Sequence, residues 1–181
     1  SKGLIITPVQ ILWVNLVTDG ILDITIAMEP KEDDVMDEAP RKPDTGIVDR
    51  DMVRNMVIIG ILMAAGTLWN FSVDYRANGL VHAQTMAFTT LAMFQFFNAL
   101  NVRSRTKSVF QIGLFTNRWL LGAMALSLLL QILANQLPIL QTALGTQPLA
   151  LADWGRVIGV SCSVFVVDEL RKLVQRRSKP S

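Results

Sequence analysis

The stretch VQILWVNLVTDGILDITIAM, Val9 to Met28, decides the fold. Its flanks are apolar enough to lie in lipid, and its length is close to the ~20 residues with which a helix crosses a bilayer. Its centre nevertheless carries Asn15, Thr18 and Asp19, and Asp23 follows one helical turn later. Carboxylates near the middle of a membrane span are costly, so they point to a functional site by default.

The rest of the sequence has the composition of a multi-span membrane protein. Hydrophobic residues make up 51% of the 181 residues, only 18% are charged, and the mean hydropathy is +0.38. A net charge of +2, with no basic stripe between aromatic residues, argues against nucleic acid as a partner. The single cysteine, Cys162, excludes an internal disulfide framework.

Hydropathy marks further segments of bilayer length after the first one. The five expected spans are Pro8 to Met28, Met52 to Val73, Ala83 to Val102, Trp119 to Leu137 and Trp154 to Leu173. The sequence therefore predicts an all-α membrane protein, a bundle of five transmembrane helices in contact with the lipid bilayer. We divide it into an ion-binding helix over residues 1–28, an acidic loop over 29–51, and a four-helix support bundle with a basic tail over 52–181.

The distribution of Lys and Arg orients this bundle. Fourteen of the 17 basic residues fall in the first connector, the third connector or the C-terminal tail. Because basic loops stay in the cytoplasm, these three regions and the C-terminus are predicted to be cytoplasmic.

The polar residues of the first span have the chemistry of a cation site. On an α-helix Asn15, Thr18 and Asp19 stand at i, i+3 and i+4, which predicts that their oxygens share one face. Amide, hydroxyl and carboxylate oxygens are hard ligands that suit calcium, sodium or magnesium. Gly20 weakens the helix beside Asp19 and can free backbone carbonyls as further ligands. The alternative is that these groups only join helices by hydrogen bonds.

These residues also form part of a motif that resembles a known protein family. WVNLVTDG, Trp13 to Gly20, resembles the sixth transmembrane helix of type II P-type ATPases, the family that includes calcium pumps. Further segments resemble later parts of that family in the same order: EPKEDDVMDEAPRKP its acidic loop, FFNALNVRS its eighth helix, NRWLLGAMALSL its ninth and VVDELRKL its tenth. The five spans would then be helices six to ten.

The resemblance implies that Asn15, Thr18 and Asp19 are ligands of the transported cation, and Asn15 favours Ca²⁺. Gln95 stands where two-calcium pumps have a glutamate, so it brings a carbonyl without a charge, which favours one ion per cycle. Asp23 stands where calcium pumps usually have a small neutral residue; an additional ligand, a proton site and no role all stay open.

The acidic loop and the later spans also contain residues for which the sequence predicts a role. The resemblance implies that the acidic loop, with Glu32, Asp34 and Asp37, couples the ion site to the cytoplasmic phosphorylation domain; a solvated turn is the alternative.

On the third span, Asn98 is expected to make hydrogen bonds between helices. Gly155 and Gly159 form a GxxxG pattern, which predicts a helix-packing seam.

The phosphorylated Asp-Lys-Thr-Gly-Thr motif of the family and its nucleotide domain are not in this sequence. We therefore expect a piece of a longer pump, whose N-terminal part is its partner and whose cytoplasmic domains bind Mg²⁺ and ATP; ATP hydrolysis is not expected on this chain alone. Two alternatives remain. The chain is a stand-alone membrane module without transport, or the pump carries Na⁺ or another cation.

Overall fold

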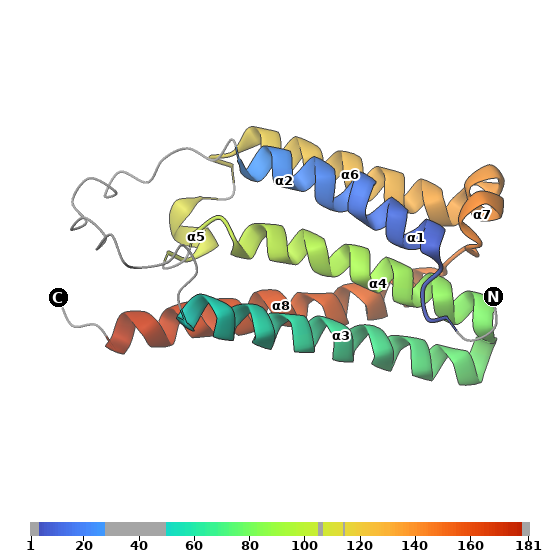
Figure 1. The fold of residues 1–181 in the computed structure, drawn as a ribbon. Helices are drawn as coiled ribbons and strands as arrows, with labels where there is room; N and C mark the ends of the chain where they lie inside the picture. The colour runs from blue at the N-terminus through green and yellow to red at the C-terminus, as the bar shows by residue number, and fades with distance from the viewer. Residues whose placement is uncertain (1–3, 28–49, 105–106, 114, 179–181) are drawn as a thin grey trace.

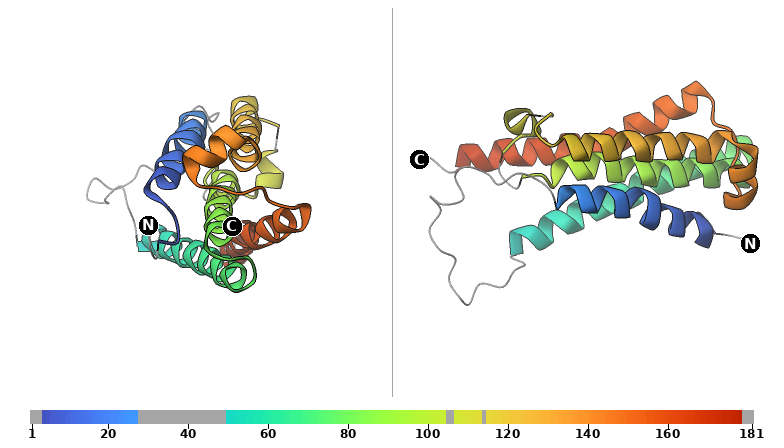
Figure 2. Two further views of the ribbon diagram at one scale, coloured as in Figure 1. Left: turned by 90° about the vertical axis from the view of Figure 1, so that its right-hand side faces the viewer. Right: turned by 90° about the horizontal axis from the view of Figure 1, so that it is seen from above.

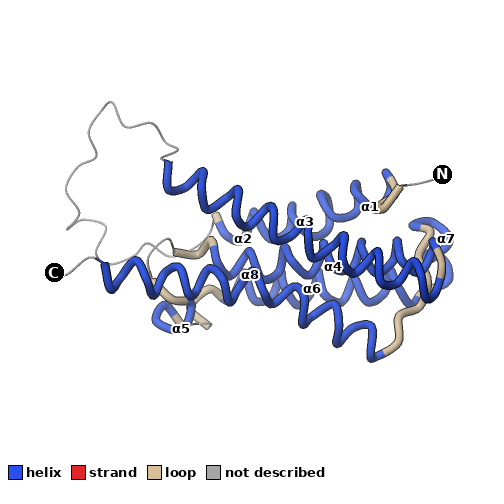
Figure 3. The backbone as a smooth tube through the Cα atoms, turned by 90° about the horizontal axis from the view of Figure 1, so that it is seen from below, coloured by secondary structure: helices blue, strands red, loops and turns tan. Residues whose placement is uncertain are grey.

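The computed structural model describes residues 4–27, 50–104, 107–113 and 115–178. Within these residues all regular structure is helical, as Figure 3 shows. The elements are α1 (Pro8–Trp13), the π-helix η1 (Val14–Asp19), α2 (Gly20–Ile26), α3 (Arg50–Asn78), α4 (Leu80–Asn101), α5 (Val109–Ile112), α6 (Arg118–Gln136), α7 (Pro138–Leu144) and α8 (Leu151–Ser178).

The long helices lie side by side in one bundle, with α1, η1 and α2 forming a single continuous rod (Figure 1). The short helices α5 and α7 lie at opposite ends of this bundle. In the end-on view of Figure 2, α4 occupies the middle, and it packs against α3, α8, α6, η1 and α2. The core of the bundle is therefore organised around α4.

In the part of the chain that the structure describes, three helical segments are long and apolar enough to cross a membrane: Pro8–Ile26, Arg50–Asn78 and Arg118–Gln136. They match the first, second and fourth predicted spans. The other two predicted spans are helices of bilayer length, with 22 residues in α4 and 28 in α8, but they are not among these three segments. In α4 polar residues occupy buried positions, among them Gln84, Thr85, Thr89 and Thr90.

Local sequence signals fix the ends of the helices around the site. Thr7 begins α1 with a capping box, in which its side chain accepts from the Gln10 backbone N–H, and Pro8 takes the first helical position. Gly79 joins α3 to α4 with φ 85°, a conformation that favours glycine. Asn117 caps α6 by accepting from the Leu120 N–H at 2.9 Å.

Close helix packing occurs at a glycine other than the predicted ones. A Cβ added to Gly66 of α3 would lie 2.7 Å from Cζ of Phe94 on α4 and 2.9 Å from Cγ1 of Val160 on α8. In contrast, a Cβ on Gly155 or Gly159 would meet no atom of another described segment within 4 Å. The predicted GxxxG seam is therefore wrong within the described part of the chain, and Gly66 is where small size brings three helices together.

Acidic residues on α3 and α8 are held in ion pairs. Asp74 of α3 is buried, and Oδ1 of its carboxylate accepts from Nη2 of Arg156 at 2.6 Å and from Nδ2 of Asn78 at 3.1 Å. Its Oδ2 contacts Nδ1 of His82, whose Nε2 lies 3.7 Å from Oδ2 of Asp153. This cluster links α3, α4 and α8 at the end of the bundle that carries α7 (Figure 1).

Candidate cation-binding site

The predicted site residues lie in the π-helix of the first rod. Over Val14–Asp19 the backbone follows the wider π pattern, in which the Gly20 N–H bonds to the Asn15 carbonyl five residues earlier. A Cβ on Gly20 would lie only 3.3 Å from that carbonyl oxygen, so glycine fits this turn best. The structure thus has a π-helix beside Asp19, a rare element that is frequent at functional sites; that Gly20 frees backbone carbonyls as ligands stays a prediction.

A serine from another helix supports the π-helix. Oγ of Ser127, on α6, donates to the Val17 carbonyl across the helix interface at 3.2 Å. Ser127 is buried. One turn further along α6, Gln131 is also buried, and both polar atoms of its side chain lack a partner.

The three predicted ligands in the π-helix lie in different environments. Asn15 is exposed, Asp19 is half-buried and Thr18 is only 1% exposed. A π-turn holds more residues than an α-turn, so Asp19, four residues after Asn15, stays close to its direction, whereas Thr18, three residues after, points away from it. Thr18 faces into the bundle and does not share a face with Asn15, so the prediction that all three oxygens share one face does not hold for Thr18.

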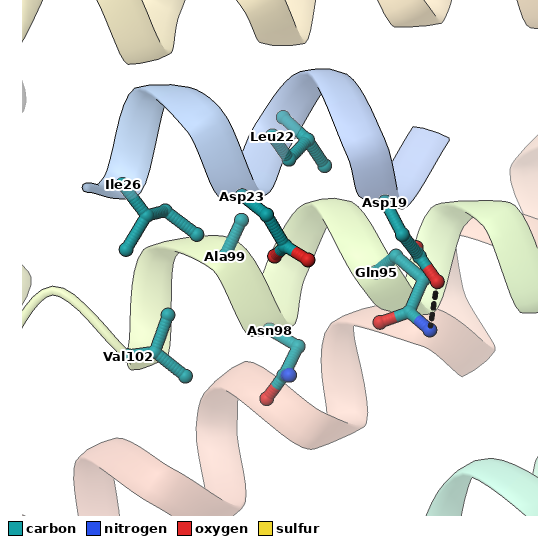
Figure 4. A pocket seen from close by; sticks show the side chains of 8 residues that line it. All are labelled: Asp19, Leu22, Asp23, Ile26, Gln95, Asn98, Ala99 and Val102. Carbon is teal, nitrogen blue, oxygen red and sulfur yellow. Dashed lines mark hydrogen bonds between the residues drawn. The ribbon is translucent and has the colours of Figure 1, made fainter. Parts of the chain in front are cut away.

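A pocket of about 220 Å³ lies between the first rod and α4. Its polar lining consists of Asp19, Asp23, Gln95 and Asn98 (Figure 4). Leu22, Ile26, Ala99 and Val102 supply the apolar lining. Gln95 makes a long contact across this pocket, in which its Nε2 donates to Oδ2 of Asp19 at 3.5 Å.

Negative charge in this pocket is not compensated by the described residues. Oδ1 of Asp19 is buried and has no hydrogen-bond partner. No Lys, Arg or His lines the pocket. An uncompensated carboxylate is costly in a low-dielectric environment, so the arrangement favours a bound cation. The lining offers carboxylate and amide oxygens, which hard cations prefer.

The chain supplies part of such a site. In the residues that the structure describes, no group of three or more His, Cys, Asp or Glu side chains could hold a metal ion. Calcium usually takes six to eight oxygen ligands. Full coordination therefore needs oxygens beyond the side chains of this pocket.

The structure brings together only part of the predicted ligand set. Asp19, Gln95 and Asp23 meet at one pocket, whereas Asn15 and Thr18 do not line it. The acidic loop with Glu32, Asp34 and Asp37 lies outside the described residues.

Sequence analysis missed two residues near the site. Asn98 lines the pocket although we expected it to join helices; its spacing of three from Gln95, which places both on one face of α4, was the available signal. Ser127 had no local signal, because its partner Val17 is 110 residues away in sequence.

The sequence matches the family model described as "Cation transporting ATPase, C-terminus" over residues 3–174. It is 38% identical over 170 residues to calcium-transporting ATPase 1 of Saccharomyces cerevisiae, and 39% identical over 158 residues to a calcium-transporting ATPase of Bacillus subtilis. It is 36% identical over 168 residues to the human calcium-transporting ATPase type 2C member 1.

These matches cover 93%, 86% and 92% of this chain but only 18% of each relative. The chain thus spans about a fifth of the length of the curated relatives that it matches. The helical bundle, the π-helix with its unpaired carboxylate and the match over residues 3–174 agree with one another. The chain belongs to the cation-transporting P-type ATPases and corresponds to the C-terminal part of their membrane domain.

Proposed function

We propose that this chain is the C-terminal membrane part of an ATP-driven pump, and that the transported cation is Ca²⁺. The observation that carries the proposal is Asp19, whose buried Oδ1 lacks a partner beside a π-helix and a pocket without a countercharge. The names of the relatives, which are calcium-transporting ATPases, support the choice of ion.

In this proposal four residues supply oxygens to the transported ion. Asp19 supplies charge, and the amide of Gln95 lies against it at 3.5 Å, so that a rotation of that amide presents its carbonyl oxygen. Asn15 is exposed on the first rod and is available to an ion held between this chain and the rest of the pump. Thr18 is buried beside them, and its hydroxyl needs a change of the π-helix to reach an ion.

The π-helix suits this role because its backbone has an alternative pattern. A shift between π and α hydrogen bonding changes the directions of the Asn15, Thr18 and Asp19 side chains together. Such a shift would change the affinity for the ion as the pump alternates between its two states.

We further propose that all five long helical rods cross the membrane with the C-terminus in the cytoplasm. The charge distribution supports this orientation. The acidic loop with Glu32, Asp34 and Asp37 would connect the π-helix rod to the phosphorylation domain. ATP and Mg²⁺ would bind in cytoplasmic domains beyond this sequence.

The test replaces Asp19 with Asn in the full-length pump and measures phosphorylation from ATP as a function of Ca²⁺ concentration. We expect Ca²⁺-dependent phosphorylation to be lost, because the amide keeps the shape but removes the charge that binds the ion. The matched control is Asp51→Asn, which removes one charge from an exposed ion pair at the start of α3. Phosphorylation of the Asp19 variant at the wild-type level would refute the ligand role. Replacing Ca²⁺ by Na⁺ in the wild-type assay decides the ion.

A further inference from the structure

We propose that Gln131 and Asn135 of α6, together with the indole of Trp13, hold one internal water molecule between α6 and the first rod, at the start of the π-helix η1. None of these three residues lines the ion pocket. The site therefore stands independently of the proposed function.

Four polar atoms at this site are buried and have no partner in the part of the chain that the structure describes. They are Oε1 and Nε2 of Gln131, Oδ1 of Asn135 and Nε1 of Trp13. Gln131 and Asn135 are 0% exposed within this chain alone, so a helix from the rest of a longer pump does not reach them. Buried polar groups without a hydrogen bond are costly, and most of them in native proteins bond to protein or to ordered water. A small molecule inside the bundle is the partner that remains.

Two hydrogen bonds fix the register between α6 and the first rod. Nδ2 of Asn117 donates to the Thr25 carbonyl at 3.1 Å. Further along α6, Oγ of Ser127 donates to the Val17 carbonyl at 3.2 Å. A forward step along α6 is thus a backward step along the rod, so the two segments run antiparallel and lie side by side (Figure 1).

This register places Gln131 opposite the start of η1, because it lies one turn past the serine that bonds to the rod. The apolar contacts agree, since Trp13 packs against a cluster that includes Val14 of η1 and Ala134 of α6. Asn135 follows Gln131 by four residues, which puts both amides on one face of α6. The three side chains therefore lie at the same level of the bundle.

The unpartnered atoms match the bonding capacity of one water molecule. Nε1 of Trp13 and Nε2 of Gln131 are donors, whereas Oε1 of Gln131 and Oδ1 of Asn135 are acceptors. A water molecule both accepts and donates hydrogen bonds, and a buried one typically makes about three of them to polar groups that otherwise have no partner. One water molecule therefore serves the rod and α6 together.

Water suits this site better than a cation. The three side chains are neutral, and an indole N–H donates a hydrogen bond but offers no lone pair to a metal. Asn135 is also held from the side of α4, since its Nδ2 donates to Oγ1 of Thr89 at 2.9 Å. The water molecule thus links α6 and α4 to the rod at the start of η1, in addition to the direct bond from Ser127.

The experiment is a double-mutant cycle in the purified full-length pump, with the midpoint of thermal unfolding as the measured quantity. Gln131→Leu removes both polar atoms at similar size and leaves Asn135 and Trp13 without the shared water. It should lower the midpoint by roughly 2 °C. Trp13→Phe removes the indole N–H. Because both side chains bond to one water molecule, the double variant should lose less than the sum of the two single losses.

Ser72→Ala combined with Trp13→Phe is the control pair, because Ser72 bonds within its own helix at the exposed surface of α3 and should give additive losses.

Two results of the cycle overturn the proposal. A midpoint for Gln131→Leu at or above that of wild type shows that its amide has no partner, since removing unpaired polar atoms from the interior is favourable. Additive losses in Gln131→Leu and Trp13→Phe show that the two side chains share no ligand. Should Gln131→Leu not fold, an experimental map of the wild-type pump that shows ordered water decides instead. A water peak within hydrogen-bond distance of both side chains supports the site, and a direct bond between them or no peak refutes it.

Discussion

The carboxylates of the first rod differ from those of α3 and α8. On α3 and α8 every acidic residue that the structure describes has a basic partner: Asp51 with Arg54, Asp74 and Asp153 with Arg156, Asp168 with Arg171 and Lys172, and Glu169 with Lys172. On the first rod Asp19 contacts only the neutral amide of Gln95, and Asp23 has no partner in the described residues. One bundle thus contains both kinds of carboxylate.

The difference separates paired carboxylates from unpaired ones. A buried carboxylate with its partner present holds helices together, and removing the partner leaves an uncompensated charge. A partly buried carboxylate without a partner lowers the stability of the fold and becomes favourable when a cation arrives. Substitutions of these two kinds of residue should therefore change different measured quantities.

The largest expected effect on stability comes from Asp74. Replacing it with Ala removes the 2.6 Å partner of Arg156 and should lower the free energy of unfolding by about 3 kcal/mol, the lower end of the cost of breaking a buried pair, because Arg156 is partly exposed and keeps Asp153 at 3.4 Å. Denaturant titration of the purified pump in detergent measures this change. Asp19→Asn is the contrasting variant and should leave the unfolding free energy equal to or above that of wild type, because it removes an uncompensated charge. Equal losses in both variants would contradict the distinction.

A smaller loss is expected at Gly66, on the closely packed side of the bundle. Gly66→Ala places a methyl group 2.7 Å from Phe94 and should lower the free energy of unfolding by about 1–3 kcal/mol through overpacking. Gly60→Ala, on the same helix, has no atom within 4 Å of the added carbon and should be neutral or slightly stabilising. The same titration compares the two variants, and a loss at Gly60 as large as that at Gly66 would contradict the packing account.

The smallest effect is expected at Ser127, and it should be local. Ser127→Ala removes the donor to the Val17 carbonyl, a hydrogen bond worth about 1 kcal/mol, and should increase amide hydrogen exchange over Val14–Asp19. Ser127→Thr keeps the hydroxyl and should retain protection. Ser72→Ala removes a hydroxyl that bonds only within its own helix, at the exposed surface of α3, and serves as the control. Unchanged exchange in Ser127→Ala would show that the π-helix does not depend on α6.

Much of the fold could be predicted because long apolar segments of a sequence indicate membrane helices. The predicted span from Trp119 to Leu137 corresponds to α6 at Arg118–Gln136, and the span from Ala83 to Val102 to α4 at Leu80–Asn101. The π-helix could not be predicted, because a repeat of three and four residues looks the same whether the backbone is α or π. The π-helix places Thr18 in the interior of the bundle, whereas Asn15 is exposed and Asp19 is half-buried.

Long-range contacts mark the other limit of prediction. Asp74 and Arg156 are 82 residues apart, and no local pattern pairs them. The glycines show the same limit. The pattern of Gly155 and Gly159 predicted a packing seam, whereas the close approach occurs at Gly66, which has no such pattern. Residue type and spacing singled out Asp19 as a candidate ligand, which stays a prediction; only the arrangement of α2 against α4 shows that Asn98 lines the same pocket.

The central position of α4 has a consequence for the biogenesis of the membrane domain. A helix with buried Gln84, Thr85, Thr89 and Thr90 is poorly suited to contact lipid alone while the chain is being inserted. It follows apolar α3 through the single residue Gly79, and Thr90 accepts a 2.9 Å hydrogen bond from Asn70 of α3. We therefore expect α3 and α4 to leave the translocon as one hairpin, with α3 shielding the polar side of its successor until α6 and α8 arrive.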